Sequence, residues 1–73
     1  MDRSATDTAV KSLLTEIRRR TDEAAGLAKA AELCAQGGNV DKGVEIALDI
    51  EQLAYEAGRL LDAASLLNRI AEE

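Results

Sequence analysis

The 73-residue chain contains no histidine and no proline, and it has only one cysteine and one aromatic residue, Tyr55. Histidine is part of the ligand set of di-metal helical bundles and is the usual base beside a nucleophilic serine or cysteine. Without it, the many carboxylates are best interpreted as a solvated acidic surface. We therefore expect no enzymatic activity, no catalytic residue, no cofactor and no metal site.

The single cysteine, Cys34, has no partner for a disulfide within the chain. It lies close to the expected end of a helix, where the negative end of the helix dipole disfavours a thiolate. We interpret Cys34 as a small buried apolar residue. An intermolecular disulfide is the alternative.

Long apolar runs are also missing, because no segment approaches the roughly 18 apolar residues of a membrane-spanning helix and the N-terminus has no apolar signal core. The net charge is −5, and residues 39–73 carry all of this excess. Binding to nucleic acid depends on basic groups that neutralise phosphates. The one basic cluster, Arg18–Arg20, would point in three directions on a helix. We expect a cytoplasmic protein that binds neither membranes nor nucleic acid.

What the chain does contain is a helix-forming composition, rich in alanine and leucine. In the first half, apolar residues recur at alternating spacings of three and four, the pattern of a coiled-coil seam. Ser4, with Asp7 three residues later, marks the helix start, and Gly37 and Gly38 mark its end. We predict a helix over about 4–36 and a turn over 37–39. Its seam residues are Val10, Leu13, Ile17, Ala24, Leu27, Ala31 and Cys34, interrupted only by Arg20.

The second half repeats the pattern. Asn39 is a suitable N-cap, and Asp41 follows in the first turn, where a negative charge suits the helix dipole. The heptad phase passes through Gly58 without a slip, which predicts one helix over about 40–72. Its seam residues are Ile46, Ile50, Leu53, Ala57, Leu60, Ala64, Leu67 and Ala71.

The two seams match when the chain reverses between Gly38 and Asn39. Val10 then faces Leu67, and most layers pair a large side chain with a small one, which lets the helices approach closely. Cys34 would face Gly43 beside the turn. The same register brings Arg20 near Glu56 and Glu16 near Arg59. We predict an all-α fold, an antiparallel, coiled-coil-like two-helix hairpin that forms a single domain over residues 1–73.

One flank of the seam is apolar and the other acidic. The apolar one, here called the alanine-rich flank, widens the apolar stripe to the width typical of a helix in a bundle core. A lone hairpin would leave it in water. The alanine-rich flank consists of Leu14, Thr21, Ala28, Ala35, Ala47, Ala54 and Leu61. The opposite side, here called the acidic flank, holds Glu16, Glu23, Asp49 and Glu56 among Ala9, Ala30, Ala63 and Ile70.

A chain of this length buries too little surface to be stable without help. Two partners could cover the alanine-rich flank: a second copy of the chain, giving a homodimeric four-helix bundle, or a different helical protein. Either makes the chain a non-enzymatic protein–protein interaction module. Outside both flanks, Leu48 and Tyr55 are seven residues apart on one line and could form a small second contact.

The Gly37-Gly38 turn near mid-chain and the apolar ending around Leu66, Leu67 and Ile70 resemble the small E-type co-chaperones of type III secretion needles. The resemblance implies a helical hairpin that keeps a needle subunit soluble together with a second, repeat-containing chaperone. It also implies that Leu14, Leu61 and Leu67 lie on or near a docking face. It implies no catalytic residue.

Overall fold

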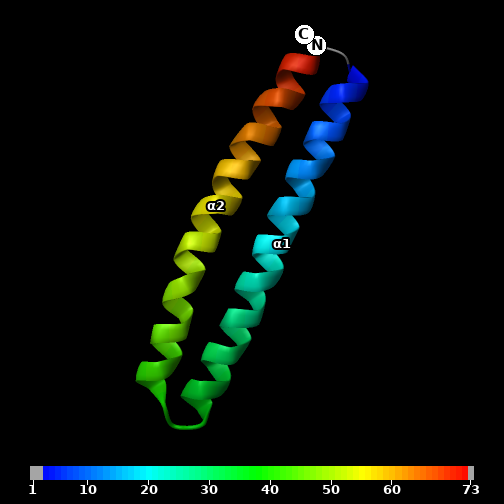
Figure 1. Ribbon diagram of the computed structural model, residues 1–73. Helices are drawn as coiled ribbons and strands as arrows, with labels where there is room; N and C mark the ends of the chain where they lie inside the picture. Colours follow the sequence, from blue (N-terminus) through cyan, green and yellow to red (C-terminus); the bar gives the residue numbers. More distant parts are fainter. Residues whose placement is uncertain (1–2, 73) are drawn as a thin grey trace.

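The computed structural model describes residues 3–72 and has two elements, α1 (Arg3–Gln36) and α2 (Val40–Glu72). The helices lie side by side and run in opposite directions, so that residues from the two ends of the chain meet at one end of the molecule and the turn forms the other (Figure 1). The molecule is a rod of 54 × 14 × 11 Å. The predicted all-α, antiparallel two-helix hairpin is confirmed.

The two rows of seam residues form the contact between the helices. Every predicted seam residue is buried or half-buried, and Arg20 is half-buried within the same row. Both helices continue through their internal glycines, Gly26 and Gly58. The heptad phase therefore gave the correct face of each helix along its whole length.

Thr6 extends this seam beyond the predicted rows. It precedes Val10 by four residues and Leu13 by seven, so it occupies the next position of the same pattern, and its side chain is fully buried. The prediction omitted it because threonine is polar. In the described part of the chain no buried side-chain oxygen or nitrogen lacks a hydrogen-bond partner, so the Thr6 hydroxyl is satisfied and its methyl group can pack in the seam.

Hydrogen bonds close the turn at both helix ends. The amides of Gly38 and Asn39 donate to the carbonyls of Ala35 and Cys34, the paired bonds of a Schellman motif. Gly38 has a φ of 98°, a conformation that glycine adopts without strain. The Asn39 side chain then accepts a hydrogen bond from the Lys42 amide at 3.0 Å. The predicted stop at the double glycine and the predicted N-cap are both confirmed.

The helix backbones come very close just beyond the turn, at Gly43. A Cβ atom on Gly43 would lie 2.7 Å from the carbonyl oxygen of Ala31 and 3.4 Å from Cβ of Ala35. Gly43 was expected to face Cys34, and the atoms nearest to its Cβ position belong instead to Ala31 and Ala35. Cys34 is free and half-buried, in keeping with its interpretation as a small packing residue. Glycine is required here by space, since backbone atoms cannot move aside as a flexible side chain can.

The close approach at Gly43 predicts opposite effects for two glycine substitutions in α2. Gly43→Ala should lower the free energy of unfolding by about 1–3 kcal/mol, because the added methyl group overpacks the contact with Ala31. Gly58→Ala should raise it by about 0.5–1 kcal/mol, because a Cβ there meets nothing within 4 Å and alanine favours the helix.

Urea unfolding followed by circular dichroism, at one fixed protein concentration, measures both changes. Equal effects of Gly43→Ala and Gly58→Ala would show that the helices are not held this close at the turn.

Candidate interaction surface

Two helices leave almost no interior. Among the described residues, the buried hydrophobic side chains are only Ala31 and Ala64. Large apolar side chains are instead widely exposed, which gives the molecule extensive surface for contact with another protein. Those that expose nearly half of their surface or more are Leu14, Leu33, Val40, Val44, Leu48, Tyr55, Leu61, Leu66 and Ile70.

The alanine-rich flank is a largely exposed strip along both helices. Leu14 and Leu61 expose 52% and 56% of their surface, and both lie toward the end of the rod opposite the turn. Toward the turn the strip is lined by alanine alone. Thr21, Ala28 and Ala54 are exposed, whereas Ala35 and Ala47 are half-buried. The strip therefore tapers from leucine at one end to alanine at the other. Its role as an interface stays a prediction.

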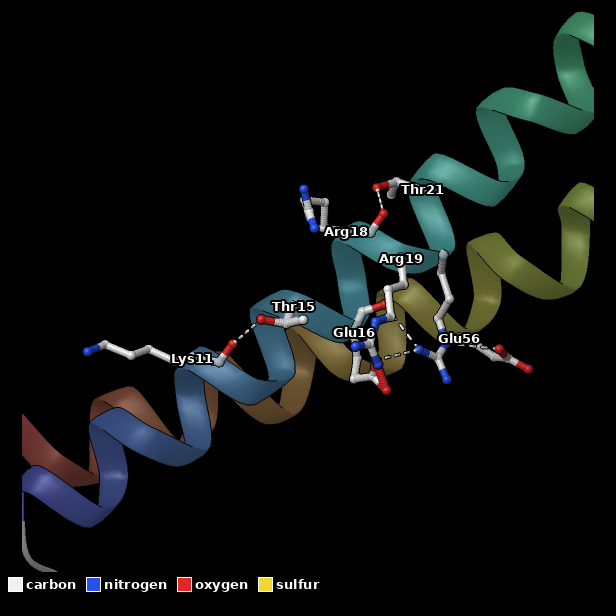
Figure 2. Close-up of polar contacts among 8 residues, drawn as sticks. Lys11, Thr15, Glu16, Arg18, Arg19, Thr21 and Glu56 are labelled. Carbon is white, nitrogen blue, oxygen red and sulfur yellow. Dashed lines mark hydrogen bonds and ion pairs between the residues drawn. The ribbon is translucent and has the colours of Figure 1, made fainter.

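Thr21 does not make this strip polar. Its hydroxyl donates a hydrogen bond to the backbone carbonyl of Arg18 at 3.0 Å (Figure 2). The hydroxyl proton is thus used within α1, and the Thr21 methyl group can be covered by a partner without leaving an unmade donor bond. Thr15, six residues earlier, likewise donates its hydroxyl proton to a backbone carbonyl of α1, that of Lys11, at 3.1 Å (Figure 2).

The acidic flank carries a network of charged side chains halfway along the rod. Nε of Arg20 donates to a carboxylate oxygen of Glu56 at 3.0 Å, across the two helices. Another guanidinium nitrogen of Arg20 donates to the backbone carbonyl of Glu16 at 3.0 Å, and Gln52 donates to the second oxygen of Glu56 at 2.9 Å. The predicted approach of Arg20 to Glu56 is confirmed. Arg20 leaves the seam and reaches its partners on the surface.

The second predicted ion pair is wrong. Glu16 was expected to approach Arg59 of the facing helix, but the ion pairs of residues 3–72 do not include this one. The Glu16 carboxylate instead contacts Arg19 at 2.9 Å and Arg20 at 3.9 Å (Figure 2). Both partners are arginines three and four residues away on the same helix, the spacing at which side chains of one helix meet.

A smaller apolar feature lies on the outer face of α2. Leu48 and Tyr55 line one surface hollow with Glu51 and Gln52, and each of the two apolar side chains exposes 62% of its surface. The structure thus brings together the two residues that the sequence placed on one line. Val44 is also exposed, but it was not assigned to any surface from the sequence. It lies three residues before Ala47, on the outer edge of the alanine-rich flank, a position that the heptad pattern could have predicted.

Neither a metal centre nor a transmembrane segment is found in the part of the chain that the structure describes. No three side chains of cysteine, aspartate or glutamate are grouped in a way that could hold an ion. Neither helix combines the length and the apolar character needed to cross a bilayer.

No match was found to a protein-family model, to a curated protein or to a solved structure. The resemblance to type III secretion co-chaperones is thus supported only by the plan of the hairpin, and no residue role is transferred from it. Evidence for a function must come from the surface itself.

The Glu56 network predicts a measurable titration. Hydrogen bonds from Gln52 and then from Arg20 lower the pKa of Glu56 below its ordinary value of 4.5. Since the folded-state pKa is the lower one, the network's contribution to stability is complete above about pH 4.5 and is lost as the pH falls through the folded pKa. Gln52→Ala should therefore raise the pKa of Glu56 toward 4.5.

Titration of the Glu56 carboxyl carbon by NMR measures this pKa in both proteins. Gln52→Glu is a matched variant of similar size that replaces the donor amide with a repelling carboxylate, and it should raise the pKa further. An unchanged titration in both variants would contradict the network.

Proposed function

We propose that this hairpin is a non-enzymatic assembly module that forms a homodimer, in which the alanine-rich flanks of two copies pack into a four-helix bundle. The observation that carries the proposal is the position of Leu14 and Leu61. These two leucines stand more than half exposed at neighbouring positions on α1 and α2, on a strip otherwise made of small residues. Covering such a strip removes apolar surface from water and supplies burial that a two-helix chain lacks.

The two flanks differ in their suitability for self-association. The acidic flank carries Glu16, Glu23, Asp49 and Glu56, so pairing it with itself would bring like charges together in a chain whose net charge is already −5. Only one of these carboxylates, Glu56, is bonded to a cation across the seam. Between Leu14 and the turn, and between Ala47 and Leu61, the alanine-rich flank has no charged residue. A second copy therefore packs on the alanine-rich flank.

A second candidate function is a small chaperone or adaptor subunit whose apolar face docks on a different helical protein. It is favoured by Leu66 and Ile70, which expose 50% and 45% of their surface at the end of α2, where the resemblance to secretion co-chaperones places an apolar ending. Leu67, which that resemblance puts on or near the docking face, is half-buried in the seam. Both functions concern a protein that acts in the cytoplasm without catalysis.

The solution mass of the pure protein tests the first function. We expect sedimentation equilibrium at micromolar concentration to give twice the chain mass of 7.8 kDa. Leu61→Glu should weaken the dimer by about 30-fold or more, because assembly would then desolvate two unpaired carboxylates.

Leu33→Glu is the matched control. Leu33 exposes 57% of its surface, almost the same as Leu61, but it lies on the opposite side of α1 from the alanine-rich flank. It should leave the dimer unchanged. A monomeric wild-type protein that gains helix only with another protein would favour the adaptor. A dimer weakened by Leu33→Glu and not by Leu61→Glu would place the interface on the other face.

A further inference from the structure

We infer that the two copies in the dimer lie with their turns at opposite ends of the bundle, α1 against α1 and α2 against α2, about a two-fold axis that passes by Thr21 and Ala54. This inference rests on the proposed homodimer and adds its geometry. Two stacked hairpins have only two symmetric arrangements with antiparallel neighbours: turns at the same end, or turns at opposite ends.

The taper of the alanine-rich flank separates these arrangements. With turns at opposite ends, Leu14 of one copy faces Ala28 of the other, and Leu61 faces Ala47. Each large side chain then meets a small one, the packing that fills space without voids or overlap. With turns at the same end, Leu14 would face Leu61 of the second copy, and Ala28 would face Ala47, so that one end is crowded and the other is hollow.

The residues at the axis fit the same arrangement. Thr21 lies halfway between Leu14 and Ala28 on α1, and Ala54 lies halfway between Ala47 and Leu61 on α2. Each of the two therefore meets the same residue of the second copy across the axis. Side chains at a two-fold axis approach themselves, so small ones fit there without overlap. The internal hydrogen bond of Thr21 to the Arg18 carbonyl lets it fill this place as a small, largely apolar residue.

Charges at the rim of the strip provide an independent argument. On α1, the helical row just outside the alanine-rich flank contains Lys11, Arg18, Ala25 and Glu32. With turns at opposite ends, Lys11 faces Glu32 of the second copy, and this pair occurs twice, while Arg18 faces Ala25. Neither Lys11 nor Glu32 takes part in an ion pair within the described hairpin, so both are available.

In the corresponding row of α2, the same arrangement brings no like charges together. This row holds Val44, Glu51, Gly58 and Ser65, and the same axis places Glu51 opposite Gly58 and Val44 opposite Ser65. With turns at the same end, Lys11 would face Ser65 and Glu32 would face Val44, so the rim would contain no opposite-charge pair. Size and charge thus select one arrangement.

Distances between spin labels test the arrangement. In a Cys34→Ala background, Gln36→Cys carries a nitroxide at the turn end of α1, and Arg69→Cys carries one at the other end of α2; both positions are exposed, and neither belongs to the alanine-rich flank. Each lies about 15 residues from the axis, so a rise of 1.5 Å per residue predicts about 45–50 Å between the two copies for both labels. Double electron–electron resonance measures these distances.

Three results would overturn the inference, and each points to a different error. A dimer with both distances at about 30 Å or less has its turns at the same end, which leaves the homodimer itself intact. Distances that differ by about 20 Å, as a slip of one heptad would produce, contradict the axis at Thr21 and Ala54. A monomeric mass for the labelled proteins and for the wild type contradicts the proposed function as well. Helix content by circular dichroism confirms that each labelled variant is folded.

Discussion

The closeness of the two helix backbones beside the turn is the constraint on which the rest of this molecule depends. At Gly43 there is no room for even one carbon atom against the Ala31 carbonyl. When two helices lie this close beside the turn, the space between them is filled by alanine side chains, or by one large side chain that faces an alanine. The seam is therefore narrow, and its small residues leave little apolar surface in the centre of the rod. Other large apolar side chains, among them Leu14 and Leu61, lie outside the seam and are exposed, which is why the surface rather than the core is the candidate functional feature.

The two flanks of the seam differ in whether side chains bridge the two helices. On the acidic flank, Arg20 joins Glu56 across the helices, with 29% and 38% of the two side chains exposed. Exposed ion pairs of this kind add little stability, but a cation in the seam row has a preferred partner and so favours one register. On the alanine-rich flank no such pair exists along the strip, and the strip stays largely exposed. One side thus favours the register of the hairpin, and the other is the side on which we propose assembly.

Periodicity carried most of the fold prediction, because each seam residue belongs to a repeat that is visible without any partner. The turn was equally predictable, since Gly38 and Asn39 act through local backbone bonds. Thr6 was missed because residue type was weighted above position, although the spacing to Val10 and Leu13 was available. The Glu16 partner was missed for a different reason: a charged side chain chooses among several cations at similar distance, and Arg19 and Arg20 were nearer than Arg59.

The alanine-rich flank could be located from sequence in the same way as the seam, and the hairpin leaves most of it exposed. Its partner could not be identified by that route, because an apolar strip is complementary to many helices. The taper in side-chain size and the charges of Lys11 and Glu32 narrow the choice, since they concern what a second surface must offer. The size taper and the charges can be compared with a second surface only when the register of the two helices is known. The structure of the hairpin supplies that register.

The three-residue connection also sets the order in which the chain can assemble. Gly43 and Ala31 are separated by a short loop, so bringing them together costs little chain entropy, whereas Arg3 and Asn68, which share a hydrogen bond at the far end, are 65 residues apart. Each seam layer formed at the turn shortens the loop that the next layer must close. Chain entropy therefore favours folding as a zipper from the turn toward the termini. In that order the leucine end of the alanine-rich flank is completed last, after its alanine end is already in place.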